Sequence, residues 1–349
     1  MNLHTLHTIV VRSIKTLLLF LLFFFIFSCN NNPKKDDKSI ASTDTSSIER
    51  KIEELTIRIK NRPKDADLLH ERAVLFLSEK DINSAFTDMT HALMMDSLKA
   101  PYYLTVADIY FAMNKTRFSK EALERCLKLD TKNVEAMLKL AELYLFVQDY
   151  TKTLGYIDDA LKIDIHNPKA YFMKGMTFKE LHDTAKTISS FQTAIEQNPK
   201  YYEAILQLGI LFSTKKDNIA LQYFNTAINL HPNSVEAYYD RGYFMQDMGE
   251  IDKAIADYNI ILQIDPKYKY AHYNLGYISH EFAKNNEQAV KHFSDAIASD
   301  AKYAEAYYMR GLSYEGLGNK KAASADYKKA LELDPDYDLA TQGLQRVGK

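Results

Sequence analysis

Ser213 and Lys216 match the Ser-x-x-Lys spacing of enzymes that use a serine hydroxyl as a nucleophile. They belong to "STKK" (213–216), a polar stretch between two predicted helices, where small polar residues and lysines are common. The histidines are scattered, and the chain has no HExxH pair, no paired-cysteine metal spacing and no glycine-rich phosphate loop. We therefore expect no enzymatic activity, no metal site and no cofactor.

Cys29 follows a segment that is typical of an export signal. Arg12 and Lys15 precede the apolar run "LLLFLLFFFIF" (17–27), and Ser28 supplies a small residue at the cleavage position. This run spans roughly 17 Å at 1.5 Å per residue, whereas the hydrocarbon layer of a membrane is ~30 Å thick. An uncleaved membrane-spanning anchor is therefore the weaker alternative.

The segment "IFSC" (26–29) resembles the lipobox of bacterial lipoproteins, in which the cysteine is acylated and becomes the new N-terminus. The resemblance implies a signal peptide over 1–28 and a palmitate-type lipid anchor on Cys29. Asn30 after the cysteine favours the outer membrane over retention in the inner membrane, by resemblance to enterobacterial lipoproteins, and we expect the chain at the periplasmic face. The charged run "KKDD" (34–37) resembles a signal for display on the cell surface, which stays open as an alternative.

The overall composition is that of a folded protein without a strong charge bias. The 349 residues include 44 basic and 46 acidic side chains, and 46% are hydrophobic. This balance gives no indication of a nucleic-acid partner. Residues 29–46 are mostly polar and almost free of large apolar side chains, so we predict a flexible tether with a reach of roughly 20 to 25 Å.

Most of the remaining chain repeats with a period of 34 residues. The predicted repeats are 66–99, 100–133, 134–167, 168–201, 202–234, 235–268, 269–303 and 304–337. The eighth residue of each repeat is alanine or glycine, positions 20 and 27 are small in nearly every repeat, and proline often stands at position 32. Small residues at helical spacing allow two helices to pack closely, and proline ends the second helix.

This pattern resembles the tetratricopeptide repeat, a helix-turn-helix unit of the same length. The resemblance implies an all-α solenoid, a right-handed superhelix of about eight such units with capping helices at both ends. We assign the caps to 47–63 and 338–349, because a solenoid must shield its terminal units. Cys126 occupies the small position 27, so we interpret it as a buried core residue and not as a reactive thiol.

Positions 2, 5, 9, 12 and 13 of each first helix share one face, which lines the concave groove in proteins of the family that the chain resembles. The apolar side chains on this face include Phe111, Leu138, Phe146, Phe172, Met176 and Ile210, and a tyrosine ladder follows with Tyr239, Tyr243, Tyr273, Tyr277 and Tyr308. Its acids on later helical turns include Asp108, Glu142, Glu180, Asp247 and Glu281. We predict a groove for a peptide with apolar and basic residues. Packing of the tyrosines between helices is the alternative.

These features together predict a lipid-anchored, non-enzymatic scaffold or adaptor that binds a protein or peptide in its concave groove. Its place would be an envelope assembly, secretion or wall-remodelling complex, by analogy with repeat lipoproteins of similar plan. The alternative is a surface glycan-binding lipoprotein that uses the tyrosine ladder as a stacking platform. The sequence predicts no particular oligomeric state.

Overall fold

The first helix of every repeat begins at the residue where the sequence repeat begins. The computed structural model describes the backbone of residues 38–348 and the side chains of residues 47–348. The described chain is all-helical and contains no strand, which confirms the predicted fold class. The first helices are α3 (Ala66–Ser78), α5 (Ala100–Ala112), α7 (Val134–Phe146), α9 (Pro168–Glu180), α11 (Tyr202–Ser213), α13 (Val235–Asp247), α15 (Lys269–Glu281) and α17 (Ala304–Gly316).

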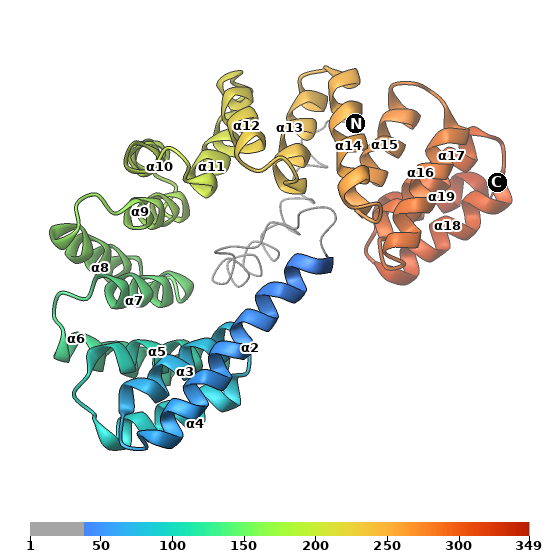
Figure 1. Ribbon diagram of the computed structural model, residues 1–349. Helices are drawn as coiled ribbons and strands as arrows, with labels where there is room; N and C mark the ends of the chain where they lie inside the picture. Colours follow the sequence, from blue (N-terminus) through green and yellow to red (C-terminus); the bar gives the residue numbers. More distant parts are fainter. Residues whose placement is uncertain (1–37, 349) are drawn as a thin grey trace.

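Each first helix packs against the second helix of its own repeat, and that second helix packs against the next first helix. The pairs therefore stack into an open arc (Figure 1). The second helices are α4 (Ile82–Met95), α6 (Thr116–Leu129), α8 (Tyr150–Ile163), α10 (Thr184–Gln197), α12 (Ile219–Leu230), α14 (Ile251–Ile264), α16 (Asn286–Ser299) and α18 (Lys320–Leu333).

The turn inside each repeat reverses the chain through one left-handed residue. In two repeats that residue is glycine, Gly249 at φ 80° and Gly318 at φ 73°. Side-chain-bearing residues adopt the same region in the others, namely Lys80, Asn114, Gln148, His182, Lys216 and Lys284. A left-handed residue of this kind lets backbone N–H groups close onto the last carbonyls of the helix, as Asp81 N does onto Phe76 O at 2.8 Å.

The small residues at positions 8, 20 and 27 lie in the core. In the last five repeats position 8 is glycine, and an aromatic ring from the second helix lies directly over it. A Cβ atom added to Gly175 would be 2.5 Å from the ring of Phe191, and one added to Gly311 would be 2.7 Å from that of Tyr327. The small residues therefore make room for rings, in addition to the close helix approach predicted from the sequence.

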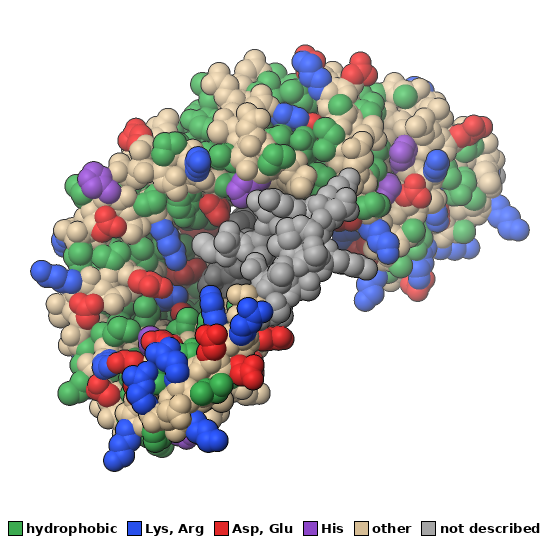
Figure 2. Space-filling view, in the orientation of Figure 1, with side chains coloured by type: hydrophobic (Ala, Val, Ile, Leu, Met, Phe, Trp, Pro, Cys, Tyr) green, Lys and Arg blue, Asp and Glu red, His purple; other side chains and the backbone are tan. Residues whose placement is uncertain are grey.

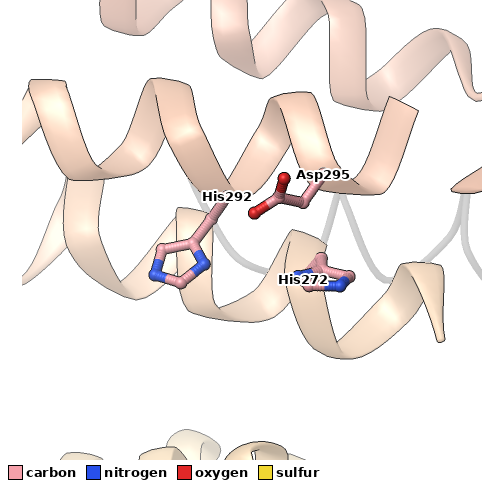
Figure 3. A group of neighbouring side chains, drawn as sticks. All are labelled: His272, His292 and Asp295. Atoms are coloured by element: carbon pink, nitrogen blue, oxygen red, sulfur yellow. The ribbon is translucent and has the colours of Figure 1, made fainter. Parts of the chain in front are cut away.

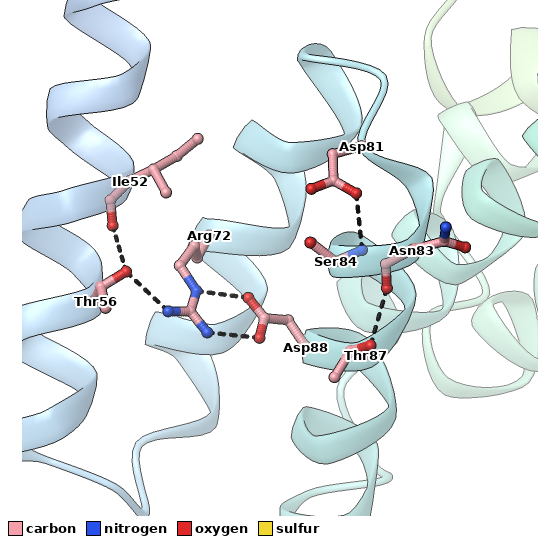
Figure 4. Close-up of polar contacts among 8 residues, drawn as sticks. All are labelled: Ile52, Thr56, Arg72, Asp81, Asn83, Ser84, Thr87 and Asp88. Atoms are coloured by element: carbon pink, nitrogen blue, oxygen red, sulfur yellow. Dashed lines mark hydrogen bonds and ion pairs between the residues drawn. The ribbon is translucent and has the colours of Figure 1, made fainter.

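A buried arginine–aspartate pair links the two helices in three of the repeats. Arg72 donates from Nε and Nη2 to the carboxylate of Asp88 at 2.7 Å each, and from Nη1 to Thr56 Oγ1 at 2.9 Å (Figure 4). The same three-way contact recurs as Arg241 with Asp257 and Asn225, and as Arg310 with Asp326 and Ser294. Each arginine thus joins its own repeat to the second helix that precedes it.

These contacts define the role of α2 (Lys38–Asn61) at the N-terminal end. Thr56 stands 16 residues before Arg72, as Asn225 stands before Arg241, so α2 occupies the place of a second helix. At the other end, α19 (Asp338–Val347) covers α18, and Arg346 donates to Glu315 at 3.0 Å. Both ends of the stack are therefore closed by an additional helix, as solenoids require.

The start of α2 differs from the sequence-based boundary. The tether was predicted to extend to residue 46, but the helix already begins at Lys38. No glycine or proline lies between Lys38 and Asn61, and adding residues to an existing helix costs little once it is nucleated. The predicted signal peptide, Cys29 and the first part of the tether lie outside the described residues. Among the helices described, none is long and apolar enough to cross a membrane.

Candidate functional site

The first helices form the inner wall of the arc. Successive first helices contact one another directly in several places, including α7 with α9 and α11 with α13. In Figure 1 α7, α9 and α11 lie on the inner side of the arc, whereas α8, α10 and α12 lie on the outer side. The side chains at positions 2, 5, 9, 12 and 13 of the first helices, together with Asp240 at position 6 of α13, are therefore the candidates for contact with a partner.

Tyrosine rings dominate this wall over α13, α15 and α17. Tyr239 is at the centre, with ring centroids 5.8 Å from Tyr268, 6.0 Å from Tyr270 and 6.4 Å from Tyr243. The series continues through Tyr273, whose ring lies 5.2 Å from that of Tyr303. Edge-on and tilted contacts at these distances are favourable for aromatic rings. The ladder predicted from the sequence is therefore part of a larger tyrosine cluster.

Several members of that cluster, including Tyr270, were not predicted, and three of them share one position in the repeat. Tyr268, Tyr303 and Tyr337 are the last residues of their repeats and stand at the N-caps of α15, α17 and α19, where none forms a side-chain capping hydrogen bond. In contrast, Asn133 at the corresponding position accepts a hydrogen bond from Ala136 N at 2.9 Å. Helices usually begin after a residue such as Asn, Asp, Ser or Thr that caps them. The repeated occurrence of tyrosine at this position is therefore the feature of the sequence from which these three residues could have been predicted.

The predicted apolar residues divide into buried and accessible sets. Leu138, Met176 and Tyr308 are only 3%, 8% and 8% exposed, so they belong to the packing between helices and not to an open groove, a correction to their predicted role. Tyr243 and Phe146 are well exposed. The remaining predicted side chains are partly exposed, namely Phe111, Phe172, Ile210, Tyr239, Tyr273 and Tyr277.

Several predicted acids already have a basic partner. Asp108 accepts a hydrogen bond from Lys139 Nζ at 2.7 Å, and Asp247 lies 3.0 Å from Lys216 Nζ. Glu281 is 3.7 Å from Lys284 Nζ in a more exposed pair. Glu142 is partly exposed and Glu180 is exposed on their helices. Neutralisation by neighbouring lysines makes Asp108 and Asp247 weaker attractants for a basic partner than the sequence suggested.

Asp240 on α13, which was not predicted, differs from these acids. Its Oδ2 atom is buried and has no hydrogen-bond partner among the described residues. Burial, and then the negative charge of Glu236, hold the pKa of Asp240 well above its ordinary value, while Lys179 acts in the opposite direction. Burial is the main cause that raises the pKa values of Tyr202, Tyr239 and Tyr268, and the charge of Asp240 adds to it. Oδ2 of this carboxylate therefore has no hydrogen-bond donor among the described side chains, and Lys179 offsets its charge only in part.

The side chains that could in principle act as nucleophiles or metal ligands are mostly held in contacts within the fold. Ser213 Oγ donates to Ile210 O at 2.7 Å, and Lys216 Nζ pairs with Asp247, so Ser213 and Lys216 are each engaged elsewhere. Cys126 is fully buried, and burial raises the pKa of its thiol to about 11, in keeping with a core role. The histidines are less scattered than the sequence suggested, because His272 and His292 lie together with Asp295.

The rest of the described surface offers no stronger site. Acidic and basic side chains are interspersed over the end formed by α2, α3 and α4 (Figure 2). A shallow depression of about 600 Å³ lies there, between the α2–α3 and α4–α5 connections. Its charges include two internal pairs, Arg62 with Asp65 at 3.2 Å and Lys99 with Asp67 at 2.6 Å. The tyrosine-rich wall around Asp240 is therefore the best candidate for binding.

Comparison with family models identifies the repeating unit. Models described as "Tetratricopeptide repeat" match residues 100–133, 168–201, 223–256 and 304–337. Three of these ranges coincide with repeats read from the sequence. The range 223–256 instead joins the second helix of one repeat to the first helix of the next.

Other proteins resemble parts of this chain in sequence or in fold. The human "Tetratricopeptide repeat protein 6" is 32% identical over 149 residues, which cover 42% of this chain and 28% of that protein. The wheat "Hsp70-Hsp90 organizing protein" is 29% identical over 144 residues, 40% of this chain and 22% of that protein. The chain thus spans less than a third of either relative. A solved tetratricopeptide repeat protein from Parabacteroides merdae shares the fold, with a TM-score of 0.52 at 16% identity, over 72% of this chain and 99% of that one.

Proposed function

Because this chain is a tetratricopeptide repeat protein, we propose that it is a non-enzymatic scaffold that binds a protein or peptide partner along its inner wall. The name of the wheat relative refers to the organisation of two other proteins, which supports a scaffold role for repeats of this kind. The tyrosine-rich surface over α13 and α15 offers a row of neighbouring aromatic rings for apolar contacts. A peptide segment fits such a surface better than a small molecule does.

The observation that carries the proposal is the unpartnered Oδ2 atom of Asp240 among tyrosine rings. A buried acceptor without a partner costs free energy, and a charged one costs more. An arginine or lysine side chain of a partner would satisfy Oδ2 and lie against the faces of Tyr239 or Tyr268, where cation–π attraction adds to the ion pair. Apolar side chains of the same segment would cover the exposed ring of Tyr243. The partner is therefore a basic and apolar segment.

The cellular setting is a further part of this proposal. The apolar run before Cys29 and its resemblance to a lipobox support a lipid anchor in the bacterial outer membrane, with the periplasmic face favoured. A scaffold held there would serve an envelope assembly, secretion or wall-remodelling complex. Metabolic labelling with palmitate tests the anchor in a bacterial host. We expect labelling of the natural chain and none of a Cys29→Ala variant, and an equal signal from both would rule the anchor out.

Binding can be tested with peptides that alternate arginine and leucine, titrated into the protein and followed by calorimetry. We expect Asp240→Asn to weaken binding by about tenfold or more, since it removes the charge that pairs with arginine. Tyr243→Ala combined with Tyr277→Ala should also weaken it. Phe118→Ala on the outer helix α6 is the matched control, because Phe118 is 41% exposed and Tyr243 is 43% exposed.

Oligosaccharides titrated in parallel distinguish the alternative. If sugars bind, and if the double tyrosine variant abolishes that binding, the wall is a glycan-binding surface and the peptide proposal is wrong. Peptide binding that is insensitive to both the Asp240 and the tyrosine variants would also contradict the assigned site.

A further inference from the structure

Three potential metal ligands meet between the two helices of the seventh repeat. His272 extends from α15, and His292 and Asp295 extend from α16, where a spacing of three residues places them on one face. One ligand atom from each lies within 4.8 Å of the other two. In Figure 3 the carboxylate of Asp295 lies between the two imidazole rings. All three side chains are partly exposed as whole residues.

The hydrogen bonding of His272 determines which of its nitrogens is free. Its Nε2 atom lies 3.0 Å from the carbonyl oxygen of Pro266. A carbonyl only accepts, so Nε2 carries the proton and Nδ1 carries the lone pair. A backbone carbonyl that orients the far nitrogen of a histidine is a common feature of metal sites in proteins.

Both histidines also leave a buried nitrogen unsatisfied. His272 Nδ1 and His292 Nδ1 have no hydrogen-bond partner among the described residues. Only four side-chain atoms in the described chain share this property, and two of them are in this cluster. Two unpaired imidazole nitrogens beside a carboxylate are poorly explained by packing alone, because such atoms normally find a partner.

We propose that His272, His292 and Asp295 bind a divalent transition-metal ion of the zinc type. Two imidazole nitrogens and one carboxylate oxygen form a ligand set that zinc accepts, with a fourth position left for water. Ligand atoms of a tetrahedral zinc site are roughly 3.4 Å apart, given bond lengths of about 2.0 to 2.1 Å. Small rotations of the three partly exposed side chains would bring them from the observed separation to that distance.

The position of the site within the repeats indicates what the ion would do. The residue corresponding to His272 is a tyrosine in four other repeats, namely Tyr103, Tyr171, Tyr238 and Tyr307. The seventh repeat also has a longer turn between its helices (282–285) than the sixth repeat (248–250). An ion held by ligands from both α15 and α16 would cross-link the helices of this repeat, and it would stabilise the folded state by mass action.

The test uses the full chain, freed of metal with a chelator and titrated with zinc sulfate. We expect one equivalent of zinc to bind by calorimetry and to raise the midpoint of thermal unfolding. His272→Tyr should weaken zinc binding more than about tenfold and remove the thermal shift, since losing a ligand costs at least as much as losing the group that orients it. This variant places tyrosine where four other repeats have it, so the fold should be retained.

Two further variants keep the result interpretable. Asp295→Asn removes the charged ligand with little change in shape and should also weaken binding, whether or not His272→Tyr folds. His182→Asn is the matched control, because it removes a histidine at a turn position where Asn114 stands in another repeat. Absence of zinc binding at tens of micromolar would overturn the proposal. Equal binding by the natural chain and by a folded ligand variant would do the same.

Discussion

At the scale of single residues, Asp240 is the least satisfied charged group on the inner wall. Two other repeats have polar side chains at the same position that find partners. Lys139 pairs with Asp108, and Gln207 accepts a hydrogen bond from Lys179 at 2.7 Å. Asp240 Oδ2 has none, and the free energy that this costs the isolated chain is what a bound cationic side chain would recover.

Asp240→Asn should therefore make the free protein more stable at neutral pH while weakening its binding. Folding raises the pKa of this carboxyl, so its charge destabilises the folded state above the folded-state pKa. The cost disappears as the pH falls through that pKa toward the ordinary aspartate range near 4. We expect a gain of about 1 kcal/mol in the free energy of unfolding at pH 7.5, and a smaller gain at pH 5.

Urea unfolding of both proteins at the two pH values measures this difference. Comparing the variant with the natural chain at each pH removes the opposing effect of His70, whose pKa burial lowers. Asp252→Asn, on the exposed face of α14, serves as the control. A gain that does not change with pH would show that Asp240 is not the titrating group.

At the scale of the helix pair, the residue at position 8 is matched to its neighbour on the second helix. The first three repeats have alanine there, and Ala73, Ala107 and Ala141 share core clusters with Met89, Leu123 and Ile157, respectively. In the last five repeats, glycine faces a phenylalanine or tyrosine ring. Alanine opposite an aliphatic side chain and glycine opposite an aromatic ring therefore fill the same space between the two helices in two ways.

Gly175→Ala should destabilise the protein by about 1 to 3 kcal/mol, because the new Cβ would lie 2.5 Å from the ring of Phe191. Adding Phe191→Leu should recover part of that loss, since the fourth repeat would then resemble the second, with Ala107 and Leu123. A double-mutant cycle by urea unfolding measures the coupling. If the two changes in the free energy of unfolding simply add, the contact between residues 175 and 191 is not the cause of the destabilisation.

At the scale of the whole molecule, stability should be distributed along the arc. Each repeat contacts its neighbours, so no single core integrates the chain. The C-terminal helix α19 covers α18, where a Cβ added to Gly343 would meet the ring of Tyr327 at 2.7 Å. Ala340 and Val347 are buried on the same interface. Without α19, the last repeat would present an apolar face to water.

Truncation after Tyr337 should therefore destabilise the C-terminal end selectively. We expect faster amide hydrogen exchange in α17 and α18, whereas exchange in α5 and α7 should be nearly unchanged, as nearest-neighbour stability predicts. Hydrogen exchange with mass spectrometry resolves the two regions. Uniform acceleration over all repeats would mean that the solenoid unfolds as one cooperative unit. The natural chain under the same conditions is the reference.

Local features of the sequence were sufficient to determine the helices and their pairing. Small side chains such as Ala73, Ala107 and Gly175 recur at the crossing of two helices because bulk there would separate them, and this constraint depends only on spacing along the chain. The same period placed Phe172 and Tyr243 on the inner face. Residues 38–46 were assigned to the tether because helix extension from a neighbouring segment is not visible in their own composition.

The composition of the tyrosine-rich wall and of the histidine cluster could be determined only from the tertiary structure. Burial of Tyr308, the unpartnered oxygen of Asp240 and the meeting of His272 with His292 each depend on side chains from different helices. Sequence periodicity determines the face of a helix on which a residue lies, but not how far its side chain reaches or what it meets there. Distances between atoms of separate helices, and hence hydrogen bonding and charge compensation, are decided only when the helices stack.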